Sequence, residues 1–357
     1  MKTLSLTGLL PEEISSLLPG KKETYRGEQI FRWIHQHNVD SFDDMTNLSK
    51  EFRKEIPEYF SIGSLTKSVV ITSQDGTTEK YVWELNDSNK IESVIIRDDN
   101  RITACISSQV GCKMRCSFCR TGLMGFRRNL NCGEILEQLL GMRRALKATG
   151  EDITNIVFMG MGEPLDNLDT VLKTIRIINM ETALSIAQRK ITVSTCGIVP
   201  GMDRVAREFK NIGMALSLNA PDDALRNELM PVNRRYPMHD LLEAARNYTQ
   251  LTKRRVTFEY ILINGINDSP EHARKLLRIA RSMPSKINLL GFNEFDESPY
   301  KRSSENNIEL FQQVLFDGHV TALLRKSRGD DILAACGQLA VQLWRSKKKR
   351  ISAEDVK

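Results

Sequence analysis

Three cysteines lie close together in the segment GCKMRCSFCR, residues 111–120. Cys112, Cys116 and Cys119 are separated by three residues and then by two. Thiolates bind zinc and iron–sulfur clusters, and a structural zinc site normally has four protein ligands. The five histidines are all far away in the sequence, so the nearest candidate for a fourth ligand is Cys105. Two interpretations remain: a closed four-cysteine site, with zinc or an electron-transfer cluster, or an iron–sulfur cluster whose fourth position takes a cofactor.

The composition is that of an ordinary globular protein. Of 357 residues, 41% are hydrophobic and 27% are charged, and no apolar run approaches the roughly 18 residues of a membrane helix. The start, MKTLSLTGLLPEE, offers no small-residue cleavage site for a secretory signal. The seven cysteines are unevenly spaced and odd in number, unlike a secreted disulfide framework. We therefore expect a cytoplasmic enzyme with no membrane partner.

The net charge of +6 permits an anionic partner such as RNA but does not require one. Basic clusters are spread through the chain, and each one alone is most simply a solvated face. Their number favours a polyanion. The clusters are GFRRNL, RRYP, TKRRV, RKSRGD and the tail RSKKKR.

Residues 1 to about 90 differ from the rest of the chain. Within residues 1–75, Ile30, Trp33 and Ile34 recur at helical spacing, which predicts a small helical N-terminal domain. In residues 76–100, TEKYVWELND and KIESVIIRDD alternate apolar and polar residues around NDSN. That pattern predicts a β-hairpin extension.

From residue 101 to 345, apolar strand segments alternate with helical patterns, and a basic tail of residues 346–357 follows. Strand–helix alternation is typical of βαβ units on a parallel sheet and predicts an α/β barrel, whole or partial. In such barrels the chemistry gathers at the C-terminal ends of the strands. The expected strands are ITACISSQV, ITNIVFMGMG, KITVSTCG, MALSLNAP, VTFEYILING, KINLLGFN and VTALLRKS.

The cysteine spacing, with Phe118 before the last cysteine, resembles the signature of the radical S-adenosylmethionine (SAM) superfamily. The segment MGMGEP resembles the superfamily's SAM-binding segment. This resemblance implies one [4Fe-4S] cluster, held by Cys112, Cys116 and Cys119, whose open iron binds SAM. It favours the open cluster over zinc.

Longer motifs resemble the RlmN/Cfr family of RNA adenine methyltransferases over about residues 20–343. The family's fold is a partial (βα)6 radical SAM barrel with a small helical N-terminal domain, which serves as an RNA-binding accessory. That fold agrees with the expected elements. The motifs are CISSQVGCKMRCSFCRTGLMGFRRNL, FMGMGEPLDN, ITVSTCGIVP, LMPVNRRYP, YILINGINDS and LLRKSRGDDILAACGQL.

The resemblance also implies a mechanism that consumes two SAM molecules per turnover. One SAM methylates a cysteine, which matches Cys336, and the other generates the radical that activates that methyl group. The resolving cysteine matches Cys105, so a transient Cys105–Cys336 disulfide forms and turnover needs a reductant. Glu92 matches the family's proton acceptor, with Cys105 as the alternative. Cys132 and Cys196 match no required role and are expected to be packing residues.

Contacts to SAM carry over to strand-end residues, where short polar side chains and glycine backbone can bind a small molecule. One position departs from the family, which commonly has histidine where this chain has Asn219. Asparagine still donates and accepts hydrogen bonds but cannot carry a proton. The matched residues are Gly162, Glu163, Ser194, Ser217, Leu218, Asn219 and Asn293.

The sequence RKSRGDDI before Cys336 is similar to family members that methylate C2 of adenine. The implied substrates are 23S rRNA, at the peptidyl-transferase centre, and in some members tRNA, next to the anticodon. The target base has to leave its stack to react. Flavodoxin or ferredoxin is the implied electron donor, and we expect a monomer. The alternatives are a C8-adenine methyltransferase of the Cfr type and a radical SAM enzyme with a substrate other than RNA.

Overall fold

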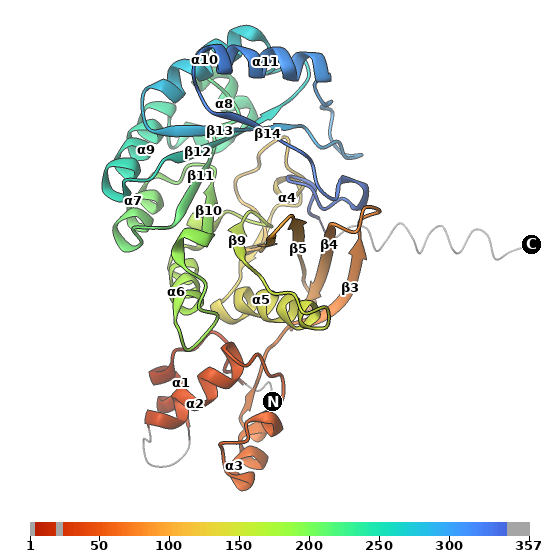
Figure 1. Ribbon diagram of the computed structural model, residues 1–357, viewed down its shortest axis with the longest axis vertical. Helices are drawn as coiled ribbons and strands as arrows, with labels where there is room; N and C mark the ends of the chain where they lie inside the picture. Colours follow the sequence, from red (N-terminus) through yellow and green to blue (C-terminus); the bar gives the residue numbers. More distant parts are fainter. Residues whose placement is uncertain (1–3, 19–23, 341–357) are drawn as a thin grey trace, which may run out of the picture.

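The computed structural model describes residues 4–18 and 24–340, and the expected basic tail of residues 346–357 lies outside the described residues. Figure 1 shows the N-terminal helices, in red and orange, gathered at one end of the molecule, with the α/β part at the other. Within the two described ranges, no helix is long and apolar enough to cross a membrane.

Among its described residues the N-terminal part has three α-helices, and local hydrogen bonds define where two of them begin. Glu13 accepts a hydrogen bond from the backbone N–H of Leu10 at 2.6 Å, at the start of α1. Ser49 caps α3 by accepting from the N–H of Phe52 at 3.2 Å. Ile30 of α2 is fully buried, in agreement with the predicted apolar face. The elements are β1 (Leu4–Ser5), α1 (Pro11–Leu17), α2 (Thr24–His35), η1 (Phe42–Asp44), α3 (Lys50–Glu55), η2 (Ile56–Glu58) and β2 (Phe60–Ser61), with β1 parallel to β2.

A ten-stranded sheet forms the centre of the molecule, in the order β14-β13-β12-β11-β10-β9-β6-β5-β4-β3. The strands from β14 to β6 are parallel, and β5, β4 and β3 continue the sheet antiparallel. All seven strands expected after residue 100 are present, and the predicted partial barrel is confirmed. Their bounds are β3 (Thr66–Thr72), β4 (Thr78–Glu84), β5 (Lys90–Asp98), β6 (Arg101–Cys105), β9 (Asn155–Phe158), β10 (Ile191–Thr195), β11 (Gly213–Ser217), β12 (Val256–Leu262), β13 (Ser285–Gly291) and β14 (Ala322–Arg325).

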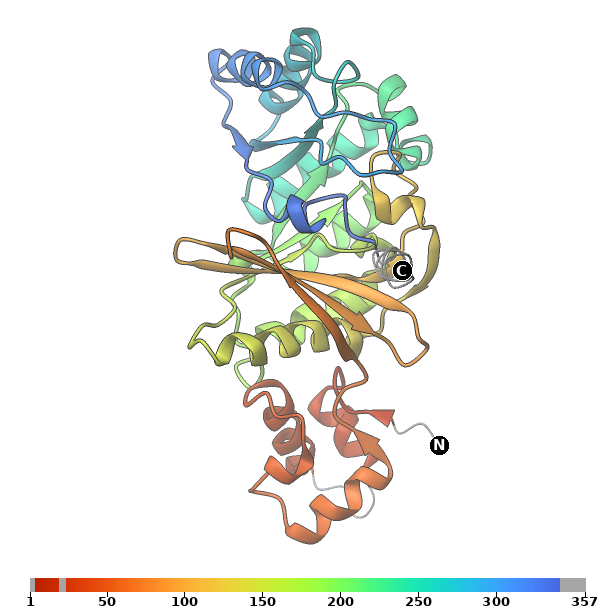
Figure 2. The same ribbon diagram turned by 90° about the vertical axis from the view of Figure 1, so that its right-hand side faces the viewer.

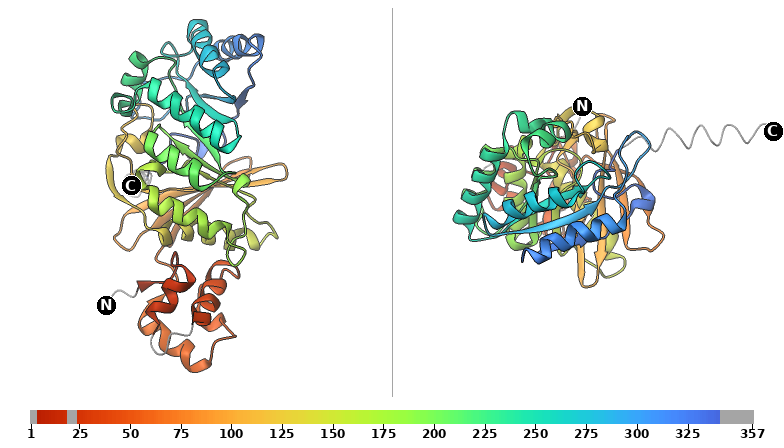
Figure 3. Two further views of the ribbon diagram at one scale, coloured as in Figure 1. Left: turned by 90° about the vertical axis from the view of Figure 1, so that its left-hand side faces the viewer. Right: turned by 90° about the horizontal axis from the view of Figure 1, so that it is seen from above.

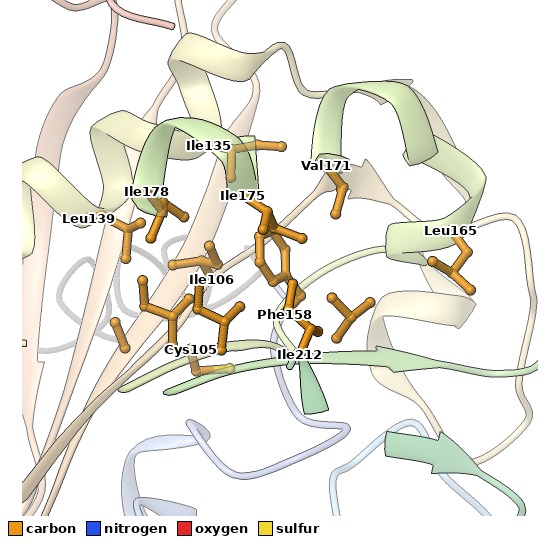
Figure 4. Packing of buried hydrophobic residues seen from close by; sticks show 14 of the residues in the cluster. Cys105, Ile106, Ile135, Leu139, Phe158, Leu165, Val171, Ile175, Ile178 and Ile212 are labelled. Carbon is orange, nitrogen blue, oxygen red and sulfur yellow. The ribbon is translucent and has the colours of Figure 1, made fainter. Parts of the chain in front are cut away.

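Helices cover one face of the parallel strands, as the two views in Figure 3 show. Figure 4 shows why they stay there: Ile135 of α5 and Ile175 of α6 point toward Ile106 and Phe158 on the sheet side, and all four side chains are buried. The helices are α5 (Cys132–Lys147), α6 (Leu168–Asn179), α7 (Val199–Glu208), α8 (Asp223–Leu229), α9 (Met238–Thr252), α10 (Pro270–Arg281) and α11 (Glu305–Asp317), and short 3-10 turns are η3 (Pro164–Asn167), η4 (Gln188–Lys190) and η5 (Pro231–Arg234).

The strands β4 and β5 form the expected hairpin, and β3 adds a third antiparallel strand to it. Because side chains alternate along a strand, the hairpin has two faces. On one face, Trp83 of β4 donates to the Ser93 hydroxyl of β5 at 2.6 Å and packs against α5 at Gly141. The other face carries Lys80 and Glu92. Figure 2 shows that the chain after β14, in dark blue, lies against the orange hairpin strands.

We call residues 326–340 the Cys336 segment. The Arg328 guanidinium of this segment pairs with Asp98 at 2.9 Å, and Asp331 accepts from the N–H of Gln74 at 2.8 Å. The segment is therefore fixed on the antiparallel strands, at the side of the sheet opposite α5. It contains the short turn η6 (Asp330–Ile332).

Replacing Gly141 by alanine should destabilise the protein, although alanine usually favours a helix interior by about 1 kcal/mol relative to glycine. A Cβ at position 141 would lie 2.5 Å from the ring of Trp83, which is buried and hydrogen-bonded. We expect the free energy of unfolding, measured by urea denaturation, to fall by roughly 1–3 kcal/mol. Lys147→Ala, at an exposed position of the same helix, should change it by less than about 0.5 kcal/mol. Equal losses in both variants would contradict the clash.

Candidate active site

The three-cysteine loop is shaped by glycines and by backbone hydrogen bonds. Gly111 has a φ of +73°, and a Cβ there would lie 1.8 Å from the carbonyl oxygen of Gly125. The N–H of Cys112 donates to that same carbonyl at 3.0 Å, and the N–H of Cys119 donates to Cys116 at 3.1 Å. These contacts fold the loop back on itself, so the three thiols lie in one compact turn. The flanking elements are β7 (Gln109–Gly111), α4 (Arg120–Leu123) and β8 (Phe126–Asn129).

The thiols of this loop influence one another electrostatically. Burial, together with the nearby Cys119, raises the pKa of Cys112 to about 12. Burial also raises the pKa of Cys116 well above its ordinary value, and both other thiols add to the effect. Three neighbouring thiolates are therefore unfavourable unless positive charge compensates them, and metal ions supply such charge.

The donor set of the loop fits an iron–sulfur cluster better than a single ion. In residues 4–18 and 24–340, no three side chains of Cys, His, Asp or Glu are arranged to hold one metal ion. A [4Fe-4S] cluster takes each thiolate on a different iron, so the three thiols need not converge on one point. Cys112, Cys116 and Cys119 would hold such a cluster.

The GEP turn after β9 lies beside the cysteine loop. Gly162 has a φ of +98°, and a Cβ there would lie 2.5 Å from the Cβ of Gln109, so only glycine fits. The buried carboxylate of Glu163 accepts from the N–H of Cys196 at 2.8 Å and from the N–H of Leu165 at 3.0 Å. Burial raises the pKa of Glu163. Its carboxylate thus joins two strand-end loops. Its negative charge also raises the pKa values of Cys112 and Cys116.

The turn after β11 carries the residues matched to SAM contacts. Asn219 has a φ of +55°, a left-handed conformation that asparagine tolerates better than most residues. Its side chain is buried, accepts from the N–H of Ile261 at 3.0 Å and contacts the sulfur of Met230 at 3.5 Å. The Asn219 side chain therefore binds the protein itself. Ser194 lies on the adjacent strand β10, where it pairs with Ala215.

Arg226 organises these loops, and the sequence patterns did not single it out. Its side chain is fully buried and donates to the carbonyls of Cys196 at 2.6 Å, Leu218 at 3.2 Å and Ser217 at 3.3 Å. It also donates to Asn233 at 2.8 Å. One guanidinium thus satisfies carbonyl groups at the ends of β10 and β11. An arginine in an otherwise ordinary helix gives no sequence signal of this role.

A cavity of about 680 Å³ contains both cysteines of the expected redox pair. Cys105, at the end of β6, and Cys336 both line it, although 231 positions separate them in the sequence (336 minus 105). Burial, together with the nearby Cys336 thiol, raises the pKa of Cys105 to about 12. Cys336 is exposed to the cavity, and Asn293 holds it in place by donating to its carbonyl at 3.1 Å.

The same cavity carries a buried carboxylate that sequence reasoning missed, beside residues of the basic RKSRGD cluster. Glu259 on β12 accepts from Asn288 at 2.8 Å and lies 3.8 Å from the guanidinium of Arg325. Desolvation inside the cavity raises the pKa of the Cys336 thiol, and the positive charge of Arg325 opposes that rise. Basic side chains at the cavity suit an anionic ligand: Arg101, Lys190, Lys286, Arg325, Lys326 and Arg328.

Glu92, on β5, packs against the Cys336 segment. It is two residues before Val94, which lines the cavity on the same face of β5. Its buried carboxylate accepts from the N–H of Ala340 at 3.0 Å and lies 3.6 Å from the ammonium of Lys80. Burial raises the pKa of Glu92 and lowers that of Lys80. A carboxyl with a raised pKa is suited to exchanging protons near neutral pH.

Replacing Arg226 by methionine should destabilise the protein strongly, because it leaves several buried carbonyl groups without their donor. We expect the free energy of unfolding in urea to fall by about 3 kcal/mol. Arg204→Met is the matched control, because Arg204 pairs with Asp169 on the exposed surface. That control should change stability by less than about 1 kcal/mol. A loss for Arg226→Met no larger than that of the control would refute the organising role.

Comparisons with known proteins place this architecture in a family. Residues 106–277 match the family model described as "Radical SAM superfamily", and residues 6–62 match "Ribosomal RNA large subunit methyltransferase N-terminal domain". The dual-specificity RNA methyltransferase RlmN of Pelobacter propionicus is 47% identical over 90% of this chain and 91% of its own length. The RlmN of Syntrophus aciditrophicus is also 47% identical, over 95% of this chain and 97% of its own length.

A solved structure agrees with the sequence relatives. The crystal structure of a radical SAM methyltransferase from Sphaerobacter thermophilus matches with a TM-score of 0.91 and 41% identity, over 94% of this chain and 99% of that chain. The predictions of the family, the fold class and the cofactors are confirmed. This chain belongs to the RlmN family of radical SAM RNA methyltransferases, which work with a [4Fe-4S] cluster and S-adenosylmethionine.

Proposed function

We propose that this protein methylates C2 of adenine, both in 23S ribosomal RNA and in transfer RNA. The names of the related RlmN proteins, which describe dual-specificity RNA methyltransferases, support two RNA substrates. The sequence RKSRGDDI before Cys336 supports C2 over C8. The basic residues of the cavity supply charge for phosphate groups. The helical part of residues 1–75, which ends before β3, serves as the RNA-binding accessory, followed by the hairpin extension and the barrel.

The observation that carries this proposal is the pair of thiols, Cys105 and Cys336, in one cavity. Carbon 2 of adenine is electron-poor, so it cannot act as the nucleophile that attacks the methyl group of SAM in an ordinary methylation. When bound, a [4Fe-4S] cluster together with SAM would supply the radical chemistry that activates an S-methyl group. In this chain, Cys112, Cys116 and Cys119 would hold the cluster, and the loops with Gly162, Glu163, Ser194, Ser217, Leu218, Asn219 and Asn293 would surround SAM.

The remaining steps belong to the two cysteines that line the cavity and to Glu92, which contacts the Cys336 segment at Ala340. The sulfur of Cys336 accepts the methyl group that becomes linked to the base. Glu92 takes the proton that the base loses. The sulfur of Cys105 attacks the sulfur of Cys336, so an S–S bond forms as the bond from that sulfur to the methylene carbon breaks. The proton that the Cys105 thiol loses ends on the methylene carbon, which thereby becomes the methyl group of the base. A reductant must then open the disulfide before Cys336 can be methylated again.

Product analysis tests the reaction. The anaerobically reconstituted enzyme, incubated with SAM, a reducing system and RNA, should yield 2-methyladenosine by mass spectrometry of digested RNA. Cys336→Ala should abolish the product while the cluster absorbance persists, because only the methyl carrier is lost. Cys132→Ala, which changes a buried cysteine outside the cavity, should retain activity. Formation of 8-methyladenosine would favour the C8 alternative, and no modified RNA with wild-type enzyme would favour a different substrate.

Replacing Cys105 by alanine should trap the enzyme on its substrate. Without the attacking thiol, the bond between Cys336 and the base cannot be resolved, so a covalent protein–RNA adduct should accumulate and migrate slowly in a denaturing gel. The double variant Cys105→Ala/Cys336→Ala should form no adduct. Free methylated RNA at the wild-type rate from Cys105→Ala would remove Cys105 from the mechanism.

A flavodoxin or ferredoxin as electron donor and a monomeric state remain predictions.

A further inference from the structure

Side chains of β4 and β5 bind the backbone of the Cys336 segment on both sides of its cysteine. Before the cysteine, the carbonyl of Leu333 accepts from the ammonium of Lys80 at 3.2 Å. After it, the N–H of Ala340 donates to the carboxylate of Glu92 at 3.0 Å. Lys80 and Glu92 are themselves 3.6 Å apart. One ion pair therefore contacts the backbone on either side of Cys336.

The Lys80–Glu92 ion pair is almost completely buried, which is unusual for charged side chains. Lys80 has no exposed surface and Glu92 is 1% exposed, whereas lysine is almost never fully buried in proteins. Removing two charges from water is so costly that an apolar pair of similar volume would often stabilise a fold as well or better. Stability alone therefore does not explain why β4 directs a lysine at this place.

The geometry around the pair favours a positioning role. Lys80 lies opposite Val94 in the β4–β5 register, and Val94 pairs with Cys105 in the β5–β6 register. The ammonium thus lies on the strand pair that also carries one thiol of the cavity, and it contacts the segment that carries the other. A third charged group lies nearby: the positive charge of Arg120 lowers the pKa of Lys80 and of Glu92. The backbone N–H of Arg120 also donates to the carbonyl of Gly337 at 2.8 Å.

We propose that Lys80 is a positioning residue for the methyl-carrying cysteine: its ammonium holds the Leu333 carbonyl and the Glu92 carboxylate together, and so fixes Cys336 opposite Cys105 in the cavity. This inference rests on the proposed roles of Cys336 and Glu92. Lys80 contacts neither RNA nor cofactor in this role. It acts through the backbone of the Cys336 segment.

The test compares Lys80→Met with the wild type in the full-length reconstituted enzyme. The kcat for RNA methylation should fall at least about tenfold, because small misplacements of reacting groups are costly. The KM for RNA should stay within about twofold, since the change removes no contact to RNA. Amide hydrogen exchange in residues 329–340 should accelerate, and the alkylation rate of Cys336 should change, as read from its peptide by mass spectrometry.

Two further variants separate positioning from packing. Lys80→Arg, which keeps a positive charge, should recover part of the kcat that Lys80→Met loses. In Lys80→Met/Glu92→Gln, exchange of residues 329–340 should remain as fast as in Lys80→Met, since both lack the charged anchor. Full protection of the segment in this double variant would overturn the proposal, because it would mean that only an unpaired buried carboxylate had loosened it.

The matched control is Glu79→Gln, the neighbouring position on β4. Glu79 pairs with Arg97 at 2.9 Å away from the Cys336 segment, so this variant should match the wild type in kcat and exchange. Unchanged kcat and exchange in Lys80→Met would overturn the inference while the proposed function stands. If the wild type itself methylates no RNA, the proposed function fails, and the exchange data still decide whether Lys80 fixes the segment.

Discussion

The pairing register of β6 is the constraint on which the site depends. This strand joins the two halves of the sheet: Cys105 pairs with Val94 on the antiparallel side and with Val157 on the parallel side. A slip of one residue would turn Cys105 to the face covered by α5 and remove it from the cavity. Figure 4 shows how the apolar side chains of α5 and α6 cover the sheet beside Cys105, and their burial keeps the register in place.

Backbone hydrogen bonds connect the cysteine loop to the rest of the site. The N–H of Ser117 donates to Leu229 at 3.0 Å, beside the loops that Arg226 organises, and the N–H of Arg120 donates to Gly337 at 2.8 Å, next to Cys336. Neither bond depends on side-chain identity. The loop that would hold the cluster is thereby tied to the turn at Leu229 and to the Cys336 segment, and the Thr121 hydroxyl adds a bond to the carbonyl of Leu339 at 2.7 Å.

Much of the fold could be predicted because its signals are local. Apolar runs between helical patterns identified every strand of the parallel sheet, and the cysteine spacing indicated the loop that would hold the cluster. Lys80 and Arg226 could not be found in this way: the contacts of Lys80 reach Leu333, 253 positions along the chain, and hydrophobic patterns treat a charged residue as solvated. Cys336 was found only through its motif, because a lone cysteine has no spacing to interpret. Strand β3 was missed because most of its side chains are exposed and none is buried, so its pattern resembles that of a surface segment.

The sheet order ends at β14 on one side and at β3 on the other, and in the described part of the chain no ladder of hydrogen bonds joins these two strands. A closed barrel can be entered only along its axis, which suits a small molecule or the free end of a polymer. An open one can be approached from the side. Here the Cys336 segment runs from the end of β14 to the turn after β3, where Asp331 accepts from the N–H of Gln74 at 2.8 Å, so this segment and not a strand spans the gap between the two ends of the sheet.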